Sequence, residues 1–247
     1  MLKYIKADIL RIYKRAFHNV MLVIMAIIVL IFVWDSPDSY NTMTSLYDQM
    51  ISAVRYGIVP IGVLGIIFSF ADDFKAKTAQ IAIGIGIPRH EVIFAKWLET
   101  MVMALLDYVI LMLFGVVANL LLSGSKITPS QWGHLFVAAL VEILTLGAFM
   151  GLTMFVAYTT KGVIFPILLY VFLSAGAINS LISKLDYIDM VQKSRITHYT
   201  MTSLSDYLGS NLYMGNLLVK PLIGLLLYCA VWLVLVWLVF RKQELDF

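Results

Sequence analysis

Charged side chains are scarce in this sequence. Asp, Glu, Lys and Arg together make up 13% of the 247 residues, whereas hydrophobic residues make up 61%. A soluble domain usually carries about 25% charged residues, so a soluble globular class is excluded. Cysteine is almost absent, and the lone Cys229 has no partner for an intrachain disulfide, a redox pair or a metal site. The bilayer is therefore the expected solvent of most of the chain.

Catalytic and nucleotide-binding signatures are also missing. The sequence contains no HExxH, no GxSxG and no Walker A motif, and its four histidines are scattered over different segments. We therefore predict no catalytic, cofactor or metal site on this chain, and any ATP and Mg would bind to a partner chain. No amino-terminal stretch combines a short apolar core with a small-residue cleavage site, so we expect no cleaved signal peptide.

What is present is a series of long apolar runs. A bilayer core of roughly 30 Å requires about 20 apolar residues per helix. Six runs qualify as predicted transmembrane helices, and they cover residues 20–34, 51–71, 93–122, 135–158, 162–182 and 217–240. The predicted fold is all-α, a single polytopic membrane domain over residues 1–247.

Basic residues indicate the orientation of this domain. They concentrate before the first run, between the second and third runs, at Lys161, and at Arg241 and Lys242 after the sixth. The positive-inside rule then places both termini in the cytoplasm. The net charge of +3 is interpreted as this topology signal and as contact with anionic lipid, and we expect no nucleic-acid binding.

Two flanking segments complete the expected architecture. Residues 1–18 carry apolar side chains at helical spacing with basic residues elsewhere around the helix, which predicts an amphipathic helix on the cytoplasmic leaflet. It would act as a passive anchor or as a lever on the first span. Residues 183–216 form a long outer loop, whose tyrosines would be interfacial anchors or a lid over a pathway.

The cytoplasmic connection 72–92 is the most informative segment. It begins with charges, continues through an apolar stretch too short to span the membrane, and reaches Gly86 and Pro88 before the next run. This order predicts a short helix that ends in a turn. Its isoleucines on the cytoplasmic side indicate a protein partner or burial against the domain; they are Ile81, Ile83, Ile85 and Ile87.

Charges inside the predicted spans are candidates for function. Burying each in lipid costs roughly 2.5–3.5 kcal/mol, so we expect each to face protein or water. They are Arg55, Glu99, Asp107 and Glu142. Arg55 and Glu142 have comparable predicted depth and could form an ion pair. Asp107 has no evident basic partner, which leaves a protonated carboxyl, a helix–helix hydrogen bond or a water-lined cavity.

The order of these segments resembles the ABC type-2 permease family. The resemblance rests on the basic amphipathic start, six spans, and the motifs Phe70-Ala71-Asp72-Asp73, Lys77-Thr78, Gly86-Ile87-Pro88-Arg89 and Phe94-Ala95-Lys96-Trp97-Leu98, with the tail 240–246. The family has glycine where Lys77 stands. Arg89 and Lys96 match its usual basic residues, and Asp72 or Asp73 matches its acid.

The resemblance implies a membrane subunit of a bacterial exporter in the plasma membrane. Such a subunit pairs with a second copy or a similar permease, and each docks a cytoplasmic ATP-binding subunit. Residues 77–89 would be the coupling element, with Asp72, Asp73 and Arg89 bracing its ends. The substrates implied are amphipathic or antimicrobial peptides, or other hydrophobic compounds. The chain would not be an enzyme by itself, because the ATPase site lies on the partner.

Two other functions fit the same residues. A proton-coupled secondary transporter would use Asp107 as its relay. A membrane sensor or anchor subunit would transport nothing.

Overall fold

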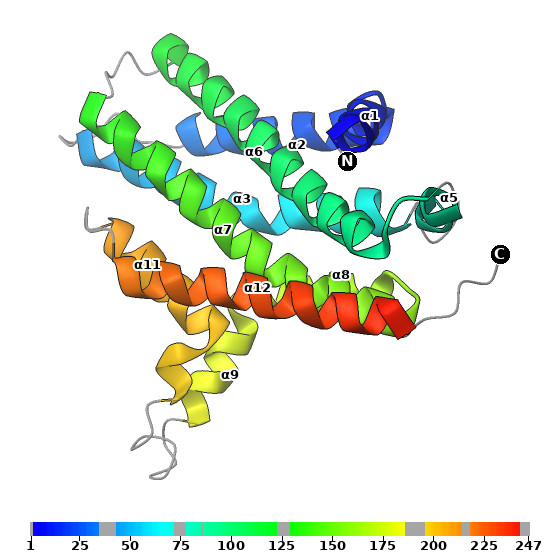
Figure 1. The fold of residues 1–247 in the computed structure, drawn as a ribbon. Coiled ribbons are helices and arrows are strands. Elements are labelled where there is room, and N and C mark those ends of the chain that lie inside the picture. Colours follow the sequence, from blue (N-terminus) through cyan, green and yellow to red (C-terminus); the bar gives the residue numbers. More distant parts are fainter. Residues whose placement is uncertain are drawn as a thin grey trace.

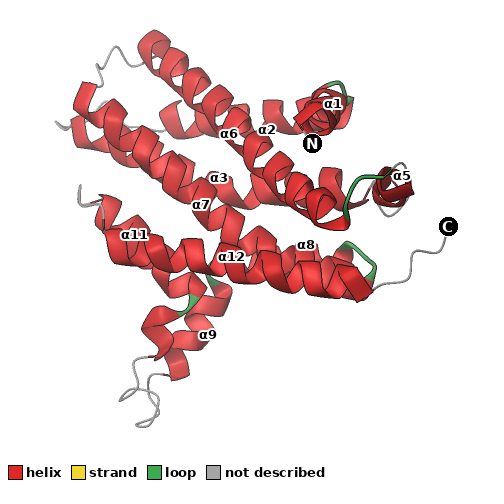
Figure 2. Ribbon diagram, in the orientation of Figure 1, coloured by secondary structure: helices red, strands yellow, loops and turns green. Residues whose placement is uncertain are grey.

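A computed structural model describes residues 2–34, 43–71, 78–84, 86–122, 129–185, 196–213 and 218–242. These ranges are helical throughout apart from short turns, and they contain no strand (Figure 2). The elements are α1 (Leu2–Tyr13), α2 (Ala16–Trp34), α3 (Met43–Ile66), the π-helical turn η1 (Ile67–Ala71), α5 (Thr78–Gly84), α6 (Arg89–Leu122), α7 (Pro129–Thr160), α8 (Ile164–Ser174), α9 (Ala177–Leu185), the 3₁₀ turn η2 (Ile196–Tyr199), α11 (Met201–Tyr213) and α12 (Val219–Lys242). The all-α class is confirmed.

Four of the described helices are long and apolar enough to cross a membrane. These stretches are Ser52–Phe70, Arg89–Ala118, Ser130–Thr160 and Val219–Arg241, and they correspond to the second, third, fourth and sixth predicted runs. A fifth is obtained if α1 and α2, which meet at a bend of 68°, count as one span. The first run begins earlier than predicted, because α2 starts at Ala16.

The fifth predicted run is not a single helix. α8 has 11 residues, which at 1.5 Å per residue covers only about half of a bilayer core. The chain then turns at Gly176, whose φ of +73° lies in the left-handed region that favours glycine. In Figure 1, α8 lies toward the end of the bundle that carries α5, α9 projects sideways, and α11 runs toward the opposite end. We name these the α5 end and the far end.

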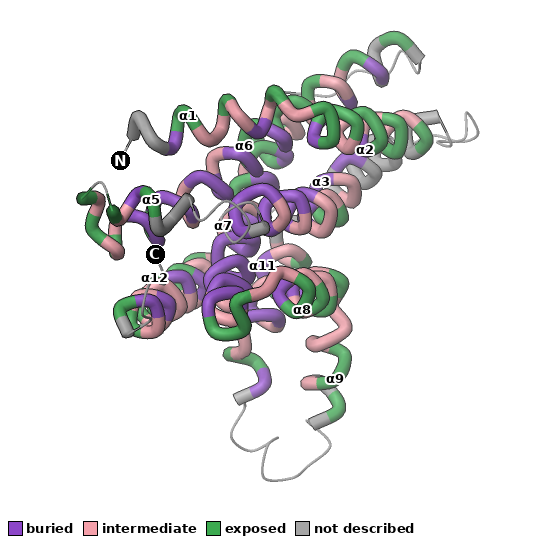
Figure 3. Tube along the Cα trace, turned by 90° about the vertical axis from the view of Figure 1, so that its right-hand side faces the viewer, coloured by how far each residue is buried: buried purple, intermediate pink, exposed green. Residues whose placement is uncertain are grey.

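α7 is the central helix of the bundle. It contacts α3, α6, α8, α11 and α12. In its most apolar stretch 67% of the residues are buried inside the protein, against 17% for α12. Figure 3 shows buried residues gathered along α3, α6 and α7, whereas α2 and α9 are mainly exposed or intermediate. Apolar side chains on the outer helices therefore face away from the protein, as expected of helices whose solvent is lipid.

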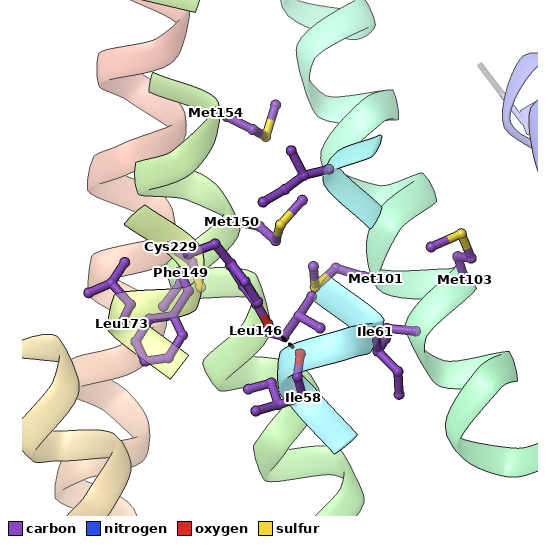
Figure 4. Close-up of a cluster of buried hydrophobic side chains, with 14 of the residues drawn as sticks. Ile58, Ile61, Met101, Met103, Leu146, Phe149, Met150, Met154, Leu173 and Cys229 are labelled. Carbon is purple, nitrogen blue, oxygen red and sulfur yellow. Dashed lines mark hydrogen bonds between the residues drawn. The ribbon is translucent and has the colours of Figure 1, made fainter. Parts of the chain in front are cut away.

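The core lies where α3, α6, α7, α8 and α12 meet. Figure 4 shows part of it, with side chains from all five helices; the labelled ones are Ile58, Ile61, Met101, Met103, Leu146, Phe149, Met150, Met154, Leu173 and Cys229. The methionines suit this role because a flexible thioether fills irregular gaps. Tyr170, which is fully buried, donates its hydroxyl to the Ile58 carbonyl at 2.7 Å. Cys229 is buried, in keeping with a packing role.

Candidate functional site

The predicted short helix between the second and third runs is α5. It ends in a Schellman turn, in which the Gly86 amide donates to the Ile83 carbonyl at 3.0 Å and the Ile87 amide donates to the Ala82 carbonyl at 3.1 Å. Gly86 has a φ of +98°, and no side chain lies within 4 Å of where its Cβ would be. Its glycine is therefore required by backbone conformation and not by crowding.

The isoleucines of this segment do not share one environment. Ile81 is 60% exposed, whereas Ile83 and Ile87 are half-buried and pack against Ala82 and Val92. The sequence left open a protein partner or burial against the domain, and for Ile83 and Ile87 the structure shows burial against the domain. They hold α5 against the start of α6, and Ile81 is the described isoleucine that α5 presents outward.

Several predicted coupling residues lie outside the described residues. Asp72, Asp73, Lys77 and Ile85 are in this group, and the structure neither supports nor contradicts their predicted roles. Thr78 begins α5 as the first residue of the helix.

Arg89 ties this segment to the last helix. Its Nη1 donates to the carbonyls of Phe240 and Arg241 at 3.1 and 3.0 Å. These carbonyls belong to the last turn of α12, where no intrahelical amide is available to them and where a cation is favoured by the helix dipole. Pro88 precedes α6, and its carbonyl accepts from the amides of Glu91 and Val92. α5, the start of α6 and the end of α12 are therefore one connected unit.

A polar stripe on α6 holds the amino-terminal helices. Residues at helical spacing on one face are fully buried, and they are Lys96, Glu99, Thr100, Met103, Ala104 and Asp107. Lys96 Nζ lies 2.7 Å from Asp8 of α1 and 3.2 Å from Glu99. Arg11 Nη2 also lies 3.1 Å from Asp8 Oδ1. Ile5 and Ile12 of α1 are buried beside these ions. The apolar face of the amphipathic helix thus packs on protein.

Asp107 makes a helix–helix hydrogen bond, which is one of the three alternatives that the sequence left open for it. The Tyr13 hydroxyl donates to Oδ1 at 2.6 Å, and His18 Nε2 lies 3.3 Å from Oδ2. The His18 ring also makes edge contacts with the rings of Tyr13 and Phe68. Asp107 therefore anchors the junction of α1 and α2 to the middle of α6.

Asp8, Lys96, Tyr13 and His18 were not predicted as site residues. One signal was available in the sequence, because Lys96, Glu99, Thr100 and Asp107 fall on one face of a helix. No local pattern indicates that α1 is the helix packed on this face, because that contact joins residues about 90 positions apart.

At the far end, Arg55 does not pair with Glu142. Its Nη2 lies 2.8 Å from Asp206 of α11, and both side chains are half-exposed. Asp206 also accepts from Asn179 of α9, whose amide oxygen accepts from Ser203 at 3.0 Å. The pairing could not be read from depth alone, because Asp206 was assigned to the outer loop and not to a helix beside α3.

Glu142 faces a cavity of about 460 Å³ beside this ion pair. The cavity lies between α3, α7, α8, α9 and α11. Its polar lining includes Arg55, Glu142, Thr145, Asn179, Thr202, Ser205 and Asp206. A second hollow of about 830 Å³ lies across α11 and shares Arg55, Asn179 and Asp206 with the first. The Arg55–Asp206–Asn179 group is the wall common to both.

Two comparisons with known proteins find no match. A scan against protein-family models finds no match for this chain, and a search of curated proteins finds none either. Within the described ranges, no three His, Cys, Asp or Glu side chains lie together as a metal site would require. The functional assignment therefore depends on the residues and their geometry.

Proposed function

We propose that this chain is the membrane-spanning subunit of an ATP-driven exporter similar to the ABC type-2 permeases. The proposal rests mainly on the position and contacts of α5. It is a short helix outside the long apolar helices, it presents Ile81 outward, and it is fixed to α6 by the Gly86 turn and to α12 through Arg89. A partner that moves α5 would move two long helices with it.

The proposal assigns six membrane crossings to the described helices. α1 with α2, then α3, α6, α7 and α12 account for five of them. The remaining crossing, which lies between α7 and α12 in the chain, is made by two separate helices, α8 and α11. Discontinuous helices of this kind are common in transporters, where their ends meet at a substrate site.

The partners follow from the same proposal. An ATP-binding subunit, which carries ATP and Mg, docks on α5 from the cytoplasm, and both termini lie on that side of a bacterial plasma membrane. A second copy or a similar permease pairs with this chain in the membrane. Substrates would be amphipathic peptides or other hydrophobic compounds, which enter from the bilayer or the cytoplasm.

Docking at α5 can be tested with Ile81→Asp. A charge at the centre of an apolar contact should remove a binding hot spot of roughly 2 kcal/mol, which lowers the ATPase recovered with the chain by about 10-fold or more. The measurement is purification from the native host at low expression, followed by mass spectrometry and ATPase assay of the bound proteins.

The matched control is Leu181→Asp on α9. Leu181 is 63% exposed, as Ile81 is 60% exposed, but it lies away from α5. This variant should keep its ATPase. Equal recovery of ATPase with Ile81→Asp and with the unmodified chain would contradict docking at α5, and a chain that purifies without any ATPase would contradict the exporter itself.

A second candidate is a proton-coupled carrier, and the contact between Asp107 and His18 favours it. A buried carboxyl and an imidazole can exchange a proton, and intramembrane acids serve as relays in carriers. In vesicles that contain only this chain, a carrier should collapse an imposed pH gradient, and Asp107→Asn should reduce the flux to that of empty vesicles. Absence of any flux through the unmodified chain excludes this candidate and leaves Asp107 as an anchor for α1 and α2.

A further inference from the structure

Glu142 is a buried carboxylate that forms no ion pair within the described structure, although the Arg55 guanidinium lies close to it. It is 8% exposed, and Arg55, the nearest cation in the cavity lining, directs its hydrogen bond to Asp206. None of the described residues donates a hydrogen bond to Glu142. Arg55 and Glu142 lie close together, because the Arg55 guanidinium carbon and Glu142 Oε1 are both within 4.0 Å of where a Cβ on Gly209 would be.

A buried carboxylate that forms no ion pair lowers the stability of the folded protein. Burial of a charge without a partner costs several kcal/mol, so the group must gain a partner, lose its charge or serve a ligand. The cavity around it carries two carboxylates and one guanidinium. Helix dipoles change the net charge around the cavity little. The carboxyl end of α8, which is partly negative, and the amino end of α9, which is partly positive, meet at the same turn.

The size and lining of the cavity select the kind of cation. About 460 Å³ is far more room than one inorganic ion needs and is typical of a small-molecule site. Ile58, Val59, Phe149 and Leu173 supply an apolar wall in addition to the polar one. A cation on an apolar stem satisfies both walls, since its charge reaches Glu142 and its stem displaces water from the apolar side chains.

We propose that this cavity binds an organic ammonium group, such as a lysine side chain of an amphipathic peptide, with Glu142 as its counter-ion. Thr145 and Ser205, which form a 3.4 Å hydroxyl contact beside Glu142, offer acceptors for the remaining ammonium protons. As a statement about what is exported, the inference rests on the proposed function. As a binding site, it requires no ATPase.

The test uses two dipeptide amides of the same shape. Acetyl-lysyl-phenylalanine amide carries the ammonium, and acetyl-norleucyl-phenylalanine amide lacks it. Binding of each to the purified chain in lipid nanodiscs is measured by calorimetry. The lysine probe should bind about 10- to 100-fold more tightly than the norleucine probe, which is the factor given by a charged hydrogen bond.

Two variants locate the preference. Glu142→Gln keeps the shape of the side chain and should abolish the preference for lysine, whereas Glu142→Asp, the control that keeps the charge, should retain part of it. Equal binding of both probes to the unmodified chain, or an undiminished preference in Glu142→Gln, overturns the proposal.

If thermal unfolding shows that Glu142→Gln does not fold, a third variant tests whether the ligand binds in this cavity. Ala175 is exposed at the cavity wall and has an ordinary backbone conformation, so Ala175→Phe fills space without removing a charge. It should weaken binding of both probes by about 10-fold, the effect of losing an apolar contact site of that size. Unchanged binding places the ligand elsewhere and overturns the proposal. Because no ATPase is present in any arm, failure here leaves docking at α5 to its own test.

Discussion

Lys96→Met should destabilise the chain by about 3–5 kcal/mol, because it removes the buried cation that lies 2.7 Å from Asp8 and 3.2 Å from Glu99. The Lys96 side chain is fully buried, so water cannot replace the lost contacts. Methionine matches the length and shape of lysine, so little packing is lost. The measurement is the free energy of unfolding in mixed detergent micelles, followed by circular dichroism.

Two further variants separate the ionic effect from a general effect of the substitution. Lys6→Met makes the same change on the exposed side of α1 and should alter the free energy of unfolding by less than about 0.5 kcal/mol. Adding Glu99→Gln to Lys96→Met should recover part of the loss, since one stranded charge is removed with its partner. A double variant no more stable than Lys96→Met alone would show that packing, and not charge, makes Lys96 important.

Loss of Lys96 should also release α1 from α6. The polar contacts between the two helices include the Asp8–Lys96 pair and the Tyr13–Asp107 hydrogen bond, and Lys96→Met removes the first of these. The sequence left open whether α1 is a passive anchor or a lever. Its contacts with α6, the helix that begins at the α5 turn, connect it to the same unit that would respond to a docked partner.

Composition and hydropathy predict much of this fold. Low charge and long apolar runs predict an all-α membrane chain, and Gly86 with Pro88 predicts the turn that ends α5, because both signals are local. The fifth run shows the limit of such signals. Residues 162–182 are apolar enough for a span, yet α8 ends at Ser174, where it packs on α3 and α7, and the chain turns at Gly176.

The candidate sites were predicted less completely than the fold. Of the four charges predicted to face protein or water, Glu99, Asp107 and Glu142 are buried inside the protein, whereas the Arg55 side chain is 47% exposed. Their partners were missed. Asp8 and Asp206 lie in segments interpreted as interfacial helix and outer loop, and the contacts they make depend on tertiary packing that spacing does not encode.

A substitution at Gly62, where α3 and α8 approach closely, should also reduce the free energy of unfolding strongly. A Cβ on Gly62 would overlap the ring of Tyr170, which is fully buried and donates to the Ile58 carbonyl. Gly62→Ala should therefore force the two helices apart or displace the ring, at a cost of roughly 3 kcal/mol. Alanine gains about 1 kcal/mol over glycine in a helix, so we expect a net loss of about 2 kcal/mol in the free energy of unfolding.

Gly133→Ala is the matched control for this clash. Gly133 lies in α7 with nothing within 4 Å of where its Cβ would be, so the same substitution should stabilise the chain by up to about 1 kcal/mol. Tyr170→Leu removes the ring that Gly62→Ala meets, so the double variant should be more stable than the sum of the two single effects predicts, by about 1–3 kcal/mol. Strict additivity would mean that Gly62 does not contact Tyr170. Ile58 and Leu173 of these two helices also line the Glu142 cavity, so a change in the spacing of α3 and α8 would reach that cavity as well.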